Sequence, residues 1–91
     1  MHPRVKKFID LTDQKNSLVN EYCETFKIKS FLENDIALFR IEFSDDSNSE
    51  TELLLLDINL DTLYVELKNC EIKLVHLYNN IEIISLKIDS L

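Results

Sequence analysis

Only a few residues of this chain have the types that chemistry requires: two cysteines, two histidines and two close pairs of carboxylates. Cys23 and Cys70 lie far apart in the sequence, and neither is spaced from His2 or His76 as metal ligands or a nucleophile and its base would be. Their apolar neighbours predict that both cysteines are buried as small hydrophobic side chains with free thiols. The sequence therefore predicts no metal site and no cysteine-based catalysis.

Four carboxylates, those of Asp45, Asp46, Glu50 and Glu52, lie in or beside a polar segment over residues 44–51. Acid–base catalysis requires a pocket that makes two such groups titrate differently, and this segment has no apolar side chains to build one. The segment also lacks the length and the glycine of a calcium-binding loop. We predict a protein that is not an enzyme and that binds no cofactor or metal.

Two serines in the same segment have a sharper pattern. Ser47 and Ser49 are each followed three residues later by a glutamate, Glu50 or Glu52, and acidophilic kinases favour this arrangement. A phosphate here would add a charge of about −1.5 to −2. The alternative, which the polar composition favours, is a flexible and solvated connector.

The composition excludes further classes of protein. The 91 residues contain no glycine, which the phosphate-binding loops of Walker A and Rossmann proteins require. Residues 1–27 carry five Lys/Arg and four Asp/Glu, a net charge of +1, whereas residues 28–91 carry five and thirteen, a net charge of −8. An acidic surface repels nucleic-acid phosphates and suits a basic protein partner, although acidity also serves solubility alone.

No apolar stretch approaches the ~20 residues that cross a membrane. The longest run covers residues 53–56 and is flanked by Glu52 and Asp57. The basic residues near the N-terminus are not followed by the long apolar core of a signal peptide. We therefore expect an intracellular protein, in the cytoplasm or the nucleus, that does not contact a membrane.

The N-terminal part of the chain has the pattern of an amphipathic helix. Pro3 suits a first helical turn, and apolar residues then recur every three or four positions. Set as heptads, the a and d positions are Val5, Phe8, Thr12, Lys15, Val19, Tyr22 and Phe26. Two of these seven are polar, so the helix either forms a coiled-coil seam or packs on a sheet of its own chain. The polar residues 12–17 leave open a break between two helices.

Apolar residues alternate with polar ones after position 28. Residues 36–43, 53–60 and 62–68 each place apolar side chains at every second position, which is typical of strands with one buried face. Residues 28–32 could form a further short strand. Short strands that follow one another predict an antiparallel meander.

The last third of the chain allows two interpretations. As strands, residues 72–78 and 81–88 form a hairpin about Asn79-Asn80, with a bulge at Ile83-Ile84. As a helix, apolar residues recur every three or four positions at Leu74, Leu77, Tyr78, Ile81, Ile84, Ile88 and Leu91. The density of isoleucine favours the hairpin slightly, and the periodicity favours the helix.

These patterns predict an α+β fold, in which an N-terminal amphipathic helix packs on a small antiparallel meander of four to five strands. The helix covers residues 1–27 and is also a candidate for the end of a coiled coil. The sheet domain covers residues 28–91, ends in a hairpin or a helix, and forms one folding unit with the N-terminal helix.

The order of these features resembles the RWD-type globular heads of small coiled-coil kinetochore subunits. The matching segments are a helix with Tyr22 near its end, the alternating residues 36–43, the acidic loop, residues 53–58, and residues 64–70, which read Tyr-Val-Glu-Leu-Lys-Asn-Cys. The resemblance implies that the first helix ends a heterodimeric coiled coil, that residues 71–91 are helical, and that the head binds a segment of an inner-kinetochore protein. The glycine that the family has near residue 27 and the proline after Cys70 are absent.

We therefore expect a non-catalytic protein–protein interaction module, in its most specific form a kinetochore-type head that dimerises with a helical partner and binds a partner segment. The alternatives are an acidic phage or viral inhibitor that mimics nucleic acid, and an acidic export chaperone. The candidate partner-binding residues are Val5, Phe8, Val19, Tyr22 and Phe26 on the helix and Asp45, Asp46, Glu50 and Glu52 in the acidic segment.

Overall fold

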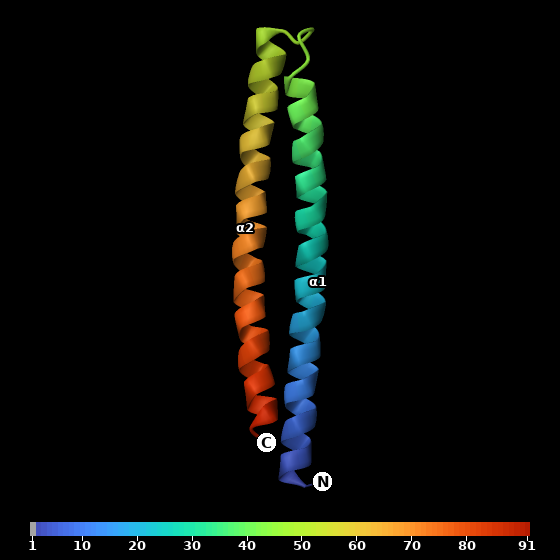
Figure 1. Ribbon diagram of the computed structural model, residues 1–91, viewed down its shortest axis with the longest axis vertical. Helices are drawn as coiled ribbons and strands as arrows, with labels where there is room; N and C mark the ends of the chain where they lie inside the picture. The colour runs from blue at the N-terminus through green and yellow to red at the C-terminus, as the bar shows by residue number, and fades with distance from the viewer. Residues whose placement is uncertain (1) are drawn as a thin grey trace.

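The computed structural model describes residues 2–91 as two long α-helices joined by a short loop. Helix α1 covers Pro3–Phe43 and α2 covers Glu50–Asp89, so they contain 41 and 40 residues. They lie side by side and antiparallel, with the two ends of the chain together at one tip and the loop at the other (Figure 1). The molecule is a rod of 70 × 14 × 14 Å.

The sequence contains little that would interrupt a helix. It has no glycine, and its single proline, Pro3, lies at the first position of α1, where a missing N–H group costs nothing. Nδ1 of His2 accepts a hydrogen bond from the backbone N–H of Arg4, 3.1 Å away, which caps this helix end. With no breaker in its interior, α1 continues until it reaches the polar residues 44–49.

The loop satisfies the backbone groups that both helices leave free at this tip. The Ser44 backbone N–H donates to the Arg40 carbonyl at 3.2 Å, and the Asn48 side chain donates to the Glu42 carbonyl, so the end of α1 is closed. At the start of α2, the Ser49 hydroxyl accepts from the Glu52 backbone N–H at 3.2 Å, and the Glu52 carboxylate accepts from the Ser49 backbone N–H at 3.0 Å. This reciprocal pair is a capping box.

The two helices meet along one seam in which side chains are withdrawn from solvent at alternating intervals of three and four residues. On α1 the buried or half-buried seam positions are Leu11, Lys15, Leu18, Tyr22, Thr25, Lys29, Leu32, Ile36 and Phe39. On α2 they are Leu53, Leu56, Leu60, Leu63, Leu67, Cys70, Leu74, Leu77, Ile81, Ile84 and Ile88. A repeat of seven residues held over the full length of both helices is the pattern of a left-handed coiled coil.

Polar residues of α1 enter the seam without leaving unpaired groups. Thr25 is only 3% exposed, and its hydroxyl donates to the Glu21 carbonyl one turn earlier at 2.8 Å. Lys29 extends along the seam to the Glu33 carboxylate, 2.9 Å from Nζ, and the hydrogen bond to Glu33 raises the pKa of this lysine. The seam is therefore less apolar on α1 than on α2.

Two contacts at the sides of the seam join the helices directly. Nζ of Lys73 on α2 lies 3.2 Å from the carboxylate of Glu21 on α1, and the Arg40 guanidinium lies 5.4 Å from the ring centre of Tyr64. Both pairs are exposed to solvent, so they contribute more to register than to stability.

The α+β prediction is wrong, because residues 2–91 contain no strand. The segments predicted as a meander, residues 36–43, 53–60 and 62–68, are all helical. They alternate because each combines seam residues with apolar residues on another side of the same helix: Leu56 and Leu60 belong to the seam, whereas Leu54 and Ile58 are exposed. A helix with two apolar faces mimics the period of a strand.

The remaining structural expectations change with the fold. Residues 72–88 are one helix, so the favoured hairpin about Asn79-Asn80 is wrong and the helical alternative is correct. The N-terminal helix shows no break at residues 12–17, and it packs on α2 instead of on a sheet. The resemblance to an RWD-type head is also wrong, since that fold needs an antiparallel sheet that the described chain does not form.

The seam should dominate the stability of the hairpin. Leu77 is 6% exposed, and shortening it by Leu77→Ala should lower the free energy of unfolding by about 2–3 kcal/mol through lost burial and the cavity left behind. Leu38→Ala, at a position of α1 that is 61% exposed, should change it by less than about 0.5 kcal/mol. Urea unfolding followed by circular dichroism measures both, and equal losses would contradict the seam.

Candidate functional site

Most of the large apolar side chains of this chain face solvent. In the described residues six apolar side chains are buried, whereas twenty large ones are exposed. Eight of the exposed ones follow α2, and we call them the outer stripe: Leu54, Leu55, Ile58, Val65, Ile72, Val75, Ile83 and Leu86. Their exposed fractions lie between 48% and 65%. Exposed apolar side chains that recur over most of a helix mark a candidate site of interaction, although polar residues such as Lys68 and Asn79 lie among them.

The outer stripe lies on the side of α2 opposite the seam. Ile58, Val65 and Ile72 follow one another at intervals of seven residues, and Leu86 continues the row two heptads later, with Asn79 between. Residues in this row are rotated by about half a turn from the seam positions, at 100° per residue. From residue 54 to residue 86 the stripe extends for about 48 Å at a rise of 1.5 Å per residue.

The rod is strongly polarised along its length. Residues 41–67, which include the loop, carry eight Asp/Glu and no Lys/Arg, a net charge of −8. At the other tip, residues 2–15 and 83–91 together carry five Lys/Arg and three Asp, a net charge of +2. The two tips are far apart on a 70 Å rod, so each presents its own sign of charge to a partner.

The apolar residues predicted to bind a partner divide between two surfaces. Tyr22 is half-buried in the seam, so it contacts the other helix of its own chain. Val5, Val19 and Phe26 are 49%, 38% and 50% exposed, and they share one flank of α1 at multiples of seven residues. Phe8 is 48% exposed near the open tip. That these four bind a partner stays a prediction.

The acidic candidates lie together at the loop tip. Asp45 accepts a hydrogen bond from the Ser47 backbone N–H at 2.9 Å, and this bond, together with one to the Ser47 side chain, lowers the pKa of its carboxyl group. Glu50 and Glu52 lie in the first turn of α2, where the helix dipole favours negative charge. Asp46 lies in the loop, between Asp45 and the start of α2. Glu50 and Glu52 therefore stabilise the start of α2, and binding of a basic partner by the four carboxylates stays a prediction.

The residues considered for chemistry lie apart from one another. Cys23 is exposed on α1, contrary to the predicted burial, and Cys70 is half-buried in the seam of α2. In residues 2–91 no three or more His, Cys, Asp or Glu side chains are grouped to hold a metal ion. Neither helix of this part of the chain has a segment long and apolar enough to cross a membrane.

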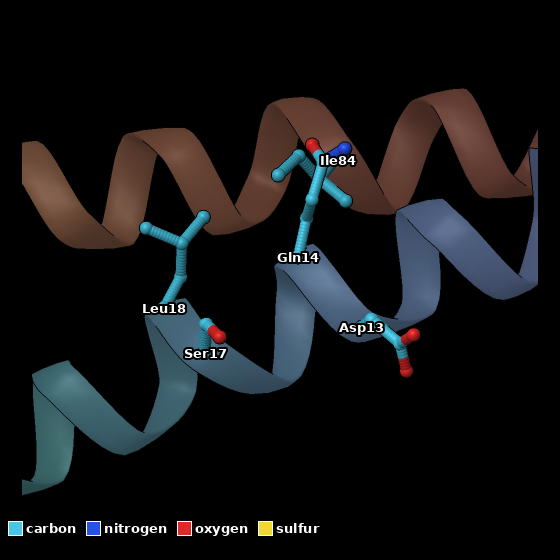
Figure 2. A pocket seen from close by; sticks show the side chains of 5 residues that line it. All are labelled: Asp13, Gln14, Ser17, Leu18 and Ile84. Atoms are coloured by element: carbon cyan, nitrogen blue, oxygen red, sulfur yellow. The ribbon is translucent and has the colours of Figure 1, made fainter.

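Several hollows on the rod are open grooves lined by residues of both helices. One is lined by Asp13, Gln14, Ser17 and Leu18 of α1 and by Ile84 of α2. Leu18 and Gln14 point from α1 toward α2, whereas Asp13 points away (Figure 2). This groove combines one carboxylate with neutral side chains, and none of the described histidines or cysteines lines it.

Comparison of the chain with known protein families, with characterised proteins and with solved structures yields no match. The surface of the hairpin itself is therefore the guide to its function.

The sequence interpretation missed the outer stripe because its residues were assigned to strands. The signal was present in the spacing of Ile58, Val65, Ile72 and Leu86, which repeat at multiples of seven. A second seven-residue repeat beside the seam indicates a helix with two apolar faces. The Ser49-x-x-Glu52 pattern, considered as a kinase site or as part of a flexible connector, is instead a capping box, for which the same spacing is the signature.

The capping box gives a test at the loop tip. Ser49→Ala removes the oxygen that accepts from the Glu52 backbone N–H, and it should lower the free energy of unfolding by about 1 kcal/mol. Ser47→Ala is the matched control, because Ser47 caps no helix and its backbone N–H can still donate to Asp45 after the substitution. Thermal unfolding measures the stability of both variants. Equal stabilities for Ser49→Ala and Ser47→Ala would refute the capping role of Ser49.

Proposed function

We propose that this protein is a non-catalytic interaction module that binds α-helical protein partners along the outer stripe of α2. The observation that carries the proposal is the row of eight exposed apolar side chains that follows α2 on the side away from α1. The described helices provide no third element to cover this row. A partner helix would supply the missing packing surface.

The amount of exposed surface supports an assembling molecule. A compact globular protein of 10.7 kDa exposes about 5,500 Å². The hairpin exposes 6916 Å², which is greater by about 1,400 Å² than this expectation. A typical specific interface covers about 800 Å² on each partner, so the excess is of the size that one or two interfaces would remove.

The spacing of the stripe favours an α-helix as the partner. Side chains at intervals of seven residues form the ridge that packs into the holes of a facing helix. Full burial of a large aliphatic side chain contributes about 1.5–3 kcal/mol, and those of the stripe are already partly shielded. Eight such residues supply enough apolar surface for a stable contact.

Charge argues against two other kinds of partner. The net charge is −7, and acidic residues such as Glu52, Asp57 and Asp61 lie next to the first half of the stripe. Nucleic acids and anionic lipid surfaces present phosphates, which these carboxylates repel. A protein helix can instead offer apolar residues to the stripe and place lysine or arginine side chains opposite some of these carboxylates.

Photo-cross-linking from single positions tests the proposal. Benzoylphenylalanine in place of Val65 or Ile72 should cross-link in cells to discrete protein bands, because both positions lie on the stripe. The matched control is the same group in place of Asn20, an exposed position on α1 outside the stripe. Bands from the stripe positions that are absent from the control support the module. The same weak smear from all three positions would reject it.

A further inference from the structure

We propose that the partner of the outer stripe is a second copy of this chain, packed antiparallel, so that two hairpins form a four-helix assembly with the α2 helices at its centre. This inference rests on the proposed function and names the partner of the same surface. It follows from the charges beside the stripe, from the order of apolar residues along it, and from the polarity of the rod.

One row of residues beside the stripe is complementary to itself when reversed. At intervals of seven residues along one flank, α2 carries Glu52, Asn59, Glu66, Lys73, Asn80 and Lys87. In reverse order the same row is Lys, Asn, Lys, Glu, Asn, Glu. Each glutamate of the row is therefore opposite a lysine of the reversed row, and each asparagine is opposite an asparagine. In an antiparallel pair of helices, equivalent flanks face each other. Glu52 then faces Lys87 of the second copy, and Glu66 faces Lys73.

Two-fold symmetry doubles these contacts to four pairs of opposite charge. In a parallel pair each flank faces the other flank of the second copy, which sets Asp61 against Glu66 and Lys68 against Lys73. These contacts are repulsive, and only Glu82 and Lys87 attract each other. Lys73 already lies 3.2 Å from Glu21 of its own chain, so in the assembly it stands between two carboxylates. Charge therefore selects the antiparallel orientation.

The other flank of the stripe is less favourable. Asp61 and Glu82 lie at seven-residue multiples there and face each other in the same arrangement. These two like-charge contacts are set against the four attractive ones, so the net charge pattern still favours antiparallel packing.

The apolar residues agree with the register that the charges set. In this register Leu55 lies in the layer of Leu86 of the second copy, and Ile58 lies in the layer of Ile83. Symmetry repeats both apolar layers at the other end of the interface. Nearer the centre of the interface the side chains are more polar, and Val65 there lies in the same layer as His76 of the second copy. This order favours the stated register, because a shift of one heptad places Leu55 against Asn79 in one direction and Leu86 against Thr62 in the other.

The polarity of the whole rod favours the same orientation. The acidic segment over residues 41–67, with a net charge of −8, lies in the antiparallel assembly on the side of the open tip of the second copy, where residues 2–15 and 83–91 carry a net charge of +2. A parallel assembly would place the two acidic tips together. Because each rod has one acidic end and one basic end, the antiparallel arrangement brings ends of opposite charge together.

Cysteine cross-linking tests the partner and its direction. In a background of Cys23→Ser and Cys70→Ala, one preparation carries Ile58→Cys and another carries Ile83→Cys. Mild oxidation of the mixture should give mainly the mixed disulfide-linked dimer, because these positions share a layer. Each preparation alone should cross-link several-fold less, since residue 58 is separated from its own copy by about 25 residues along the interface, or about 37 Å. Circular dichroism confirms that each variant remains helical.

The outcomes distinguish this inference from the proposed function. Efficient cross-linking of Ile58→Cys alone would show a parallel pair and overturn the inference. A mass of 10.7 kDa for the unsubstituted chain at tens of micromolar by sedimentation equilibrium, in place of twice that value, would also overturn it. If the stripe positions then photo-cross-link only to other proteins, the module survives with a different partner. If they cross-link to nothing, both proposals fail.

A charge variant tests the complementary row. Glu66→Lys places a lysine against Lys73 of the second copy twice in each dimer, and it should raise the dissociation constant of the dimer on the order of tenfold. Glu24→Lys is the matched control, because it makes the same change of charge on α1, at a position paired only with the exposed Lys27. Equal dissociation constants for the two variants would overturn the proposed register.

Discussion

Everything in this molecule depends on one interaction, the packing of α1 against α2 along a seam that repeats every seven residues. In the described chain the two helices have no other element to pack on, so Leu32, Leu60, Leu74 and Leu77 and their neighbours in the seam supply all of the buried apolar contact. A seam of two helices can cover only one side of each. The radius of gyration is 20.5 Å, whereas a compact domain of this length has about 12 Å. The exposed far side of α2 is therefore a direct consequence of the fold, and it is where function is to be sought.

The two helices contribute unequally to the seam, because the side chains from α2 are more apolar than those from α1. Helix α2 contributes leucine, isoleucine and one half-buried cysteine, while α1 contributes Lys15, Thr25 and Lys29 among its apolar residues. Each polar entry is tolerated because its stem packs and its polar group has a partner or reaches solvent, yet it adds less than a leucine would. A hairpin with such a seam gains from any partner that binds only the folded form, since binding lowers the free energy of the folded state by mass action. Association along α2 would support the helix that carries both apolar faces.

Particular residues explain what the sequence could and could not predict. Pro3 predicted the start of a helix correctly. The spacing of Leu74, Leu77, Ile81, Ile84 and Ile88 indicated the helix that forms, although the density of isoleucine slightly favoured a hairpin. Residues 53–60 misled because seam and stripe overlap there: Leu53 and Leu56 face α1, Leu54 and Leu55 face solvent, and the sum resembles a buried strand. The absence of glycine was used to exclude phosphate-binding loops, although it also removes the usual residue of tight turns and helix ends. The acidic loop at the tip could be predicted from its polar sequence. The outer stripe could not, because the sequence alone does not show which apolar face of α2 packs against α1.

Small-angle X-ray scattering tests the central claim most directly, since it measures length and mass together. Two hairpins side by side and antiparallel should have a largest dimension close to the 70 Å of one rod, plus a few ångströms of side chains and hydration, with twice the scattering mass of a 10.7 kDa chain. Over the range of micromolar concentrations in which the dimer forms, the length should stay constant while the cross-section increases. A largest dimension near 140 Å would mean that the rods join end to end or that the two helices separate into one long helix. Either result would contradict an assembly built along the outer stripe of α2.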